Sequence, residues 1–279
     1  MQRFKNSIVK TIALILQIFI LLVIGGLAWK FIHHTPVVPS HVYPYLTGIL
    51  PDIVLESHHE GVNLSVTGWA DLLAVKSTLE KQQASPIIQQ LKQGVVFDKI
   101  NWELADTSPE TAREVKERRK ILLDYPLYEP LRYAFPVQGQ SWYEDSWGAK
   151  REGGKRLHEG TDLFAEEGTP LFSVCAGEIE KLGWNRLGGE RVGIRGEDGN
   201  YYYYAHLKEI ESSLKIGQLI TKGAFIGTMG HTGDALTTPD HLHFGIQLRD
   251  GTWINPYPFL SVWQHYPTEF NRSSDLPKG

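Results

Sequence analysis

The sequence contains a single cysteine, Cys175, among its 279 residues. A single thiol cannot form an internal disulfide, and one cysteine is too few for a cysteine-rich zinc site. Cys175 lies within the apolar run at residues 170–176, where a small buried side chain is expected rather than a reactive thiol. Any metal held by this chain must therefore be bound mainly through nitrogen and oxygen ligands.

An excess of charge of one sign is also missing. The chain has 28 Lys and Arg residues against 32 Asp and Glu residues, a formal net charge of -4, and no basic cluster follows the N-terminus. This balance excludes a nucleic-acid partner bound by bulk charge. The sequence has no internal repeat and no low-complexity tract. Its hydrophobic content of 42% is enough for a real core in one large domain or two modest ones.

Long apolar runs are absent except at residues 11–29. At about 1.5 Å per residue this run would make a helix of roughly 28 Å, close to the thickness of a bilayer's hydrocarbon core. Three basic residues precede it, and after Lys30 no Lys or Arg occurs until Lys76. We therefore expect a signal-anchor transmembrane helix within residues 1–32, with a cytoplasmic N-terminus and the remainder extracytoplasmic, on the periplasmic or cell-wall side. A cleaved signal peptide is the alternative.

Residues 33–130 are expected to form an extracytoplasmic spacer or accessory region with short helices. Helical patterns cover about 71–83, 86–93 and 109–124. The last begins with a good capping signal, because Ser108 is followed by a proline and a glutamate. This region could hold the following domain away from the membrane, bind an envelope protein partner, or cover an active site.

The sequence pattern changes in residues 131–265, where short runs typical of β-strands replace the helical patterns. From Gly139 onward the chain carries 21 of its 27 glycines, and these separate the runs. Residues 191–207 read as a hairpin with an Asp-Gly turn. We therefore predict a mainly β fold built on an antiparallel sheet, preceded by the mixed, partly helical N-terminal region. Residues 266–279 are expected to be a flexible C-terminal tail.

Two histidines are placed together by the pattern His241-Leu242-His243. Side chains alternate faces along a strand, so both imidazoles would share one face while Leu242 and Phe244 enter the core. One imidazole can then bind a metal while the other lies over the metal's water. Such a pair is also common on exposed strands without any metal, so the pattern alone is weak.

Further candidate ligands lie upstream. His158 and Asp162 are four residues apart, and a bend at Gly160 would bring both to one point. His206 lies in a predicted strand at residues 200–207, where alternation would put it on the face of Tyr202 and Tyr204. It could then approach the same groove from a neighbouring strand, and the hydroxyl of Tyr204 could also serve the site. A neutral imidazole, a carboxylate and one more histidine suit zinc with a fourth position open for water.

These motifs together resemble the M23 family of zinc metallopeptidases, of the lysostaphin and LytM type. The similarity runs from about Tyr133 to Leu260, nearly half of the chain, in the correct order and spacing. One stretch departs from it, because residues 232–240 are about two residues longer than is usual. The matching segments are Phe135-Pro136-Val137 with Trp147-Gly148, Leu157 to Leu163, Gly168 to Leu171, Tyr204 to Leu207, Gly217-Gln218, Gly227 with Thr232-Gly233, and His241 to Phe244.

The resemblance implies a role for each histidine motif. His158, Asp162 and His243 match the family's ligands for one Zn²⁺ ion, and His206 and His241 match its two catalytic histidines. The implied activity is a zinc-dependent endopeptidase that hydrolyses peptide bonds in bacterial cell-wall peptidoglycan. The alternatives are a non-hydrolytic, zinc-containing envelope scaffold or partner-binding protein, and a purely structural zinc site.

Overall fold

The computed structural model describes residues 42–47, 49, 52–53, 65–129 and 132–265. All of them fall within one compact unit of the chain, Val38–Gly279. The predicted membrane helix and the predicted C-terminal tail lie outside the described residues. Among the helices that are described, none has both the length and the apolar character needed to cross a bilayer.

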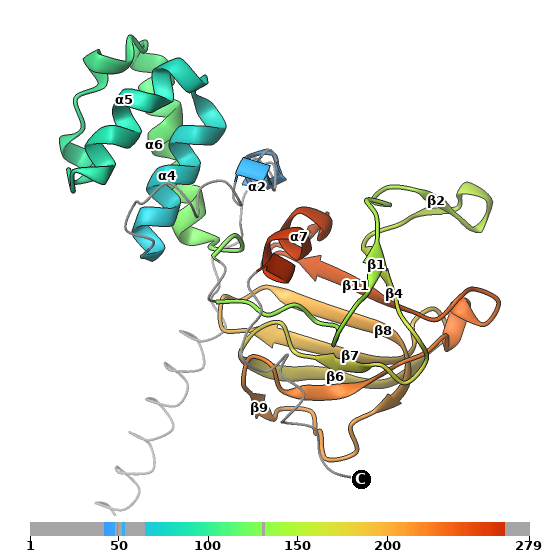
Figure 1. The fold of residues 1–279 in the computed structure, drawn as a ribbon. Coiled ribbons are helices and arrows are strands. Elements are labelled where there is room, and N and C mark those ends of the chain that lie inside the picture. Colours follow the sequence, from blue (N-terminus) through green and yellow to red (C-terminus); the bar gives the residue numbers. More distant parts are fainter. Residues whose placement is uncertain (1–41, 48, 50–51, 54–64, 130–131, 266–279) are drawn as a thin grey trace, which may run out of the picture. The chain divides into compact units, whose positions relative to one another are not determined.

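The first part of the described chain is helical (Figure 1). Its cap at Ser108 is confirmed, because the Ser108 side chain accepts a hydrogen bond from the Thr111 backbone at 3.0 Å. The helices are α2 (Val42–Thr47), α4 (Val66–Thr78), α5 (Lys81–Lys92) and α6 (Pro109–Asp124), with 3-10 turns η1 (Phe97–Lys99) and η2 (Trp102–Ala105).

Two of the three predicted helices have the wrong bounds. The helix expected at 71–83 is interrupted because Leu79 is extended, with φ -103° and ψ 144°, and its side chain is buried in the core. A new helix begins at Lys81 and continues through Pro86, which had been expected to start it. Burial of Leu79 thus overrides the local helical pattern. The third helix, α6, packs its few apolar residues against α4, and Val115 is fully buried.

The second part of the described chain is the predicted antiparallel sheet. The strand order along its main path is β1-β4-β11-β8-β7-β6-β9. Off this path, β10 pairs with both β5 and β8, and β12 pairs with β11. The predicted hairpin is β7 with β8. The strands are β1 (Trp142–Tyr143), β2 (Lys150–Arg151), β3 (Arg156–Leu157), β4 (Thr161–Phe164), β5 (Pro170–Phe172), β6 (Gly177–Asn185), β7 (Gly189–Gly196), β8 (Tyr201–Ile210), β9 (Leu219–Ile220), β10 (Phe225–Met229), β11 (His241–Gln247) and β12 (Trp253–Ile254).

One face of this sheet forms the core, and helix α7 (Tyr257–His265) contributes to it. Leu242, Phe244 and Ile246 alternate into this core and are fully buried, as the strand pattern predicted. Trp263 of α7 lies edge-on to Phe244, with ring centroids 6.3 Å apart. Cys175 is buried, as expected. The opposite face of β4, β11 and β8 therefore remains available for a site.

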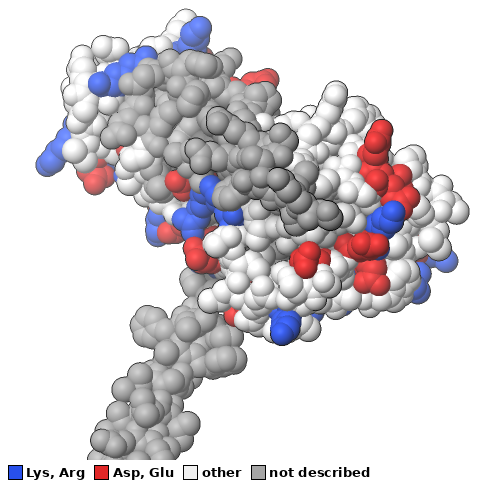
Figure 2. Space-filling model, turned by 60° about the horizontal axis from the view of Figure 1, so that its bottom comes forward, with Lys and Arg blue, Asp and Glu red and all other residues white. Residues whose placement is uncertain are grey.

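The charged side chains on the described surface are mixed in sign. Figure 2 shows Lys and Arg residues interspersed with Asp and Glu residues on the face that it presents. That face carries no broad basic field, in agreement with the formal net charge of -4.

Candidate metal centre and groove

Strand pairing sets two of the candidate ligands opposite each other. Asp162 of β4 is the register partner of His243 of β11, so their side chains lie on the same face. His158 reaches that face from the loop before β4, where its backbone N–H donates to the carbonyl of Ala149 at 2.8 Å. The chain bends at Gly160, and a Cβ there would lie 2.6 Å from His243 Nε2. Glycine is therefore required to leave room for the imidazole.

The three donor atoms converge on one point. His158 Nε2 lies 3.0 Å from Asp162 Oδ1 and 3.0 Å from His243 Nδ1, and the last two atoms are 2.9 Å apart. Ligands around a tetrahedral zinc ion with bonds of about 2.1 Å are about 3.4 Å apart. A small outward shift of each side chain would therefore accommodate the ion. The residues fit a metal with nitrogen and oxygen ligands, and they form a metal-binding group.

Protonation at this cluster also favours a cation. Burial opposes ionisation of Asp162, but its polar contacts with the rings of His158 and His243 outweigh it and hold the pKa of the carboxyl well below its usual range. Burial lowers the pKa of His243, against the influence of Asp162. Asp162 is therefore ionised near neutral pH while His243 is neutral, as metal ligation requires.

Two neighbours orient these ligands from outside. His158 Nδ1 lies 3.0 Å from the backbone carbonyl of Ser146, which can only accept, so Nδ1 carries the proton and Nε2 is free to bind metal. Arg151 of β2 donates from Nη2 to Asp162 Oδ2 at 2.7 Å, on the oxygen that does not face the histidines. No sequence pattern identified Ser146 or Arg151, because both contacts depend on how the chain before β4 folds back.

A second pair of imidazoles lies beside the ligands. The rings of His206 and His241 have centroids 4.9 Å apart. Each ring is held through Nδ1 by a carbonyl, at 2.7 Å from Thr232 for His206 and 2.8 Å from Pro239 for His241. The carbonyls fix the proton on Nδ1, so both Nε2 atoms are free to accept one. His241 Nε2 is 3.9 Å from Asp162 Oδ1, next to the metal-binding group.

His206 lies on the groove as expected, but the expectation that it shares a face with Tyr202 and Tyr204 is wrong. Tyr202 and Tyr204 are fully buried in the core, whereas His206 lines the groove. The register between β7 and β8 shifts at this point, and His206 adopts a left-handed φ of 66°. Its backbone N–H donates to Gly188 instead of continuing the ladder. This bulge resets the alternation of side chains and moves His206 onto the groove face.

The hydroxyl of Tyr204 has a packing role. It accepts a hydrogen bond from the Val174 backbone at 2.9 Å inside the core and does not reach the site.

The imidazole of His206 has a pKa that is lowered to about 4 by burial and then by His241 and His243. His206 is therefore neutral near pH 7 and can accept a proton.

His231 belongs to a different cluster from these five residues. His231 pairs with Asp240 at 2.6 Å and, with Glu167, forms a second group of possible metal donors. Glu167 is already paired with Lys208 at 2.8 Å, so that group is partly neutralised. His265 ends α7, and His33, His34, His58 and His59 lie outside the described residues.

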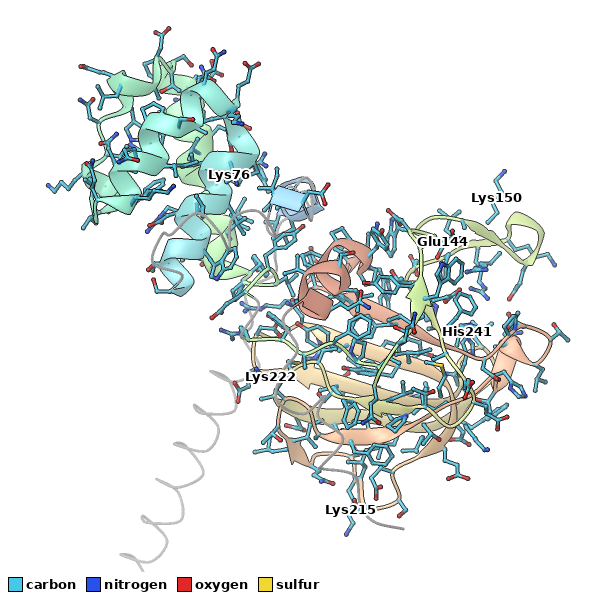
Figure 3. All side chains as sticks on the ribbon, in the orientation of Figure 1. Lys76, Glu144, Lys150, Lys215, Lys222 and His241 are labelled. Atoms are coloured by element: carbon cyan, nitrogen blue, oxygen red, sulfur yellow. The ribbon has the colours of Figure 1, made fainter. Side chains whose placement is uncertain are left out.

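A groove of about 1100 Å³ contains the centre. The β2–β3 hairpin and the long stretch at 232–240 both line it, the latter through Asp234, Ala235, Thr238 and Pro239. Arg156 of the hairpin pairs with Asp234 at 3.0 Å, which connects these two segments. Figure 3 marks His241 at the sheet and Lys150 out on the hairpin. The groove is thus open to a chain-like ligand that passes over the imidazoles.

Comparison with known proteins identifies the family of the region that contains the centre. Residues 156–256 match the model of Peptidase family M23. The chain is 38% identical over 168 residues to the L-Ala--D-Glu endopeptidase of Bacillus subtilis (strain 168), which covers 56% of this chain and 52% of that protein. It is 34% identical over 109 residues to lysostaphin of Staphylococcus simulans, covering 37% of this chain and 21% of lysostaphin.

A solved structure, the catalytic domain of lysostaphin from Staphylococcus simulans, aligns with a TM-score of 0.38 and 31% identity, covering 43% of this chain and 92% of that one. The chain spans about half the length of the Bacillus relative and about a fifth of lysostaphin. The matched region contains all five histidine and aspartate residues of the centre, from His158 to His243. Residues 156–256 therefore form a domain of peptidase family M23.

Proposed function

We propose that this protein is a zinc-dependent endopeptidase that hydrolyses peptide bonds in bacterial cell-wall peptidoglycan. The observation that carries the proposal is the convergence of three donor atoms, each 2.9–3.0 Å from the others, beside two further imidazoles in one groove. The relatives point to the substrate class, since one is an L-Ala--D-Glu endopeptidase and another is a peptidoglycan DD-endopeptidase of Vibrio cholerae.

His158, Asp162 and His243 would hold the single Zn²⁺ ion. Their set of two imidazoles and one carboxylate is typical of catalytic rather than structural zinc, which usually has four protein ligands. When bound, the ion supplies Lewis acidity, which lowers the pKa of water and polarises a carbonyl oxygen. Two outer hydrogen bonds, which the Ser146 carbonyl accepts from His158 and Arg151 donates to Asp162, would keep two ligands in the required orientation.

His206 and His241 would move the protons. Both Nδ1 atoms are fixed by carbonyls, so each Nε2 can accept a proton from the attacking water or, once protonated, donate one. One imidazole would act as general base, and the other would hydrogen-bond the developing oxyanion or protonate the leaving amine. A non-hydrolytic scaffold would have no use for two such positioned imidazoles, which favours the enzyme over the alternative.

The division of the chain follows from the same proposal. Residues 1–32 would anchor the protein in the bilayer with a cytoplasmic N-terminus, and residues 33–130 would hold the peptidase away from the membrane or recruit an envelope partner. Residues 131–265 would form the peptidase domain outside the cytoplasm, and 266–279 a tail. The apolar run at 11–29 and the basic residues before it support this arrangement.

Alanine substitution tests the roles separately. His158→Ala, Asp162→Ala and His243→Ala are expected to lose zinc and activity together. His206→Ala and His241→Ala are expected to keep zinc and lose at least about 100-fold in kcat, the usual worth of a general acid or base. The measurements are zinc content and release of fragments from purified peptidoglycan. Full activity of His241→Ala would contradict the assignment.

A further inference from the structure

Arg191 is a cationic side chain on the floor of the groove. It lies on β7 next to Val192, which is fully buried on the core face. At this point the register between β7 and β8 shifts, opposite His206. Arg191 and Gly193 therefore face the groove, and Arg191 is one of its lining residues. The shift places Arg191 one strand away from His206 and two strands away from His243 of β11.

The guanidinium of Arg191 forms no ion pair and no hydrogen bond with the described residues, although it lies close enough to Tyr201 to act on the pKa of that phenol. Its Nη1 atom is enclosed and makes no hydrogen bond. Other arginines near it are paired, since Arg195 of the same strand meets Glu180 at 2.8 Å and Arg156 meets Asp234. An enclosed cationic donor without an acceptor is costly, so its position is best explained by a ligand that supplies the acceptor.

The surroundings of Arg191 indicate the chemistry of that ligand. Lys181 of β6 is the register partner of Gly193, lines the same groove, and makes no ion pair with the described residues. Tyr203 and Trp253 form an aromatic floor beside them, with ring centroids 6.2 Å apart. Two cations that line one groove with two aromatic rings suit a carboxylate on a peptide whose apolar atoms rest on those rings.

The distance from the metal-binding group fits a position on the substrate. Neighbouring strands lie about 4.8 Å apart, so Arg191 lies about 10 Å from His243 across the sheet, which an extended peptide covers in about three residues. We propose that Arg191, assisted by Lys181, binds a carboxylate of the substrate peptide within about three residues of the scissile bond. This subsite rests on the proposed function, and it selects acidic stem peptides over neutral chains such as oligoglycine.

The test compares two forms of one substrate on the full chain loaded with zinc. Soluble muropeptides are used with their stem carboxylates free or converted chemically to amides. Arg191→Gln is expected to raise KM about tenfold or more for the free form, the usual worth of a charge-assisted hydrogen bond, and to leave the amidated form within about twofold. Zinc content and kcat should stay unchanged. Lys181→Gln should show the same selectivity with a smaller loss.

The matched control is Arg186→Gln. Arg186 is exposed in the turn between β6 and β7 and does not line the groove, so the same loss of charge should leave both KM values unchanged. Arg191→Lys keeps the charge and should recover part of the preference, which separates binding from misfolding.

The possible results separate two failures. A wild-type enzyme that cleaves neither form would contradict the proposed function. A wild-type enzyme that cleaves both forms with equal KM, or an Arg191→Gln variant that loses both equally or neither, would overturn the carboxylate subsite while the peptidase assignment stands.

Discussion

Arg151 lies outside the candidate ligands but orients one of them, Asp162, and so is expected to affect the affinity for the metal. Its Nη2 atom holds Asp162 Oδ2 at 2.7 Å, which leaves Oδ1 directed at the two histidines. We expect Arg151→Gln to weaken zinc binding by about 10- to 100-fold, as for other groups that orient a metal ligand. Competition with a fluorescent chelator measures this affinity. Lys150→Gln on the same strand is the control, because Lys150 is exposed; equal affinities in both variants would remove Arg151 from the centre.

The titration of His243 makes the centre resistant to acid. Its pKa is lowered by burial, so protons compete with the metal only below the usual histidine range near pH 6.5. Folded protein with a lowered histidine pKa keeps the neutral, metal-binding form as the pH falls through 6.5. Zinc content after dialysis between pH 7.5 and 4.5 should therefore fall with a midpoint below 6.5. A midpoint at or above 6.5 would show that His243 titrates like an exposed imidazole.

At the scale of elements, one ion pair connects the β2–β3 hairpin to the η4 loop (Gly233–Ala235). Arg156 contacts both Glu152 of its own hairpin and Asp234 of the loop, with about a third of each side chain exposed. Such exposed pairs contribute about 0–1 kcal/mol, so the connection can open and close readily. We expect Asp234→Asn to change the free energy of unfolding by less than about 1 kcal/mol. The same change should increase amide hydrogen exchange in residues 150–157.

The matched variant for that experiment is Glu152→Gln, which removes the local partner of Arg156 but keeps the bridge to the loop. It should leave exchange in the hairpin nearly unchanged. Equal protection in the wild type and in Asp234→Asn would mean that packing, and not the ion pair, holds the hairpin in place.

The elements that the sequence predicts well are those whose pattern is local. Alternation places His241 and His243 on one face of β11, and the capping signal at Ser108 locates the start of α6. The face of His206 could not be predicted by alternation, because a bulge between two strands depends on the register of both. Leu79 likewise leaves the helical conformation in order to be buried.

Contacts between segments that are distant in the sequence are a second kind of feature that local sequence patterns do not predict. Arg151 reaches Asp162 only because a hairpin folds back over the sheet. Arg191 lines the groove because its neighbour Val192 enters the core and the groove forms over the opposite face of the sheet. The histidine and aspartate ligands are recognisable because their chemistry is rare and their spacing is fixed. Arginine is common on surfaces, so nothing but the fold distinguishes these two from the others.

At the scale of the whole molecule, Tyr128 connects the helical part to the sheet. Its buried hydroxyl donates to the carbonyls of Leu46 and Ile49, and its ring lies 4.6 Å from Phe259 of α7. Trp263 of the same helix donates to the Leu127 carbonyl at 2.9 Å. These contacts predict that the helices and the peptidase domain unfold together, because neither can separate without exposing Tyr128.

Tyr128→Phe tests this coupling without touching the groove. Removing the hydroxyl leaves two buried carbonyls without their donor, which should cost about 1–3 kcal/mol in the free energy of unfolding. Urea denaturation of the zinc-loaded protein should show one transition in the wild type, shifted to lower urea in the variant, while kcat on a short peptide is unchanged. Two separate transitions in the wild type would show that the segments unfold independently, and Tyr128 would then act only within the helical part.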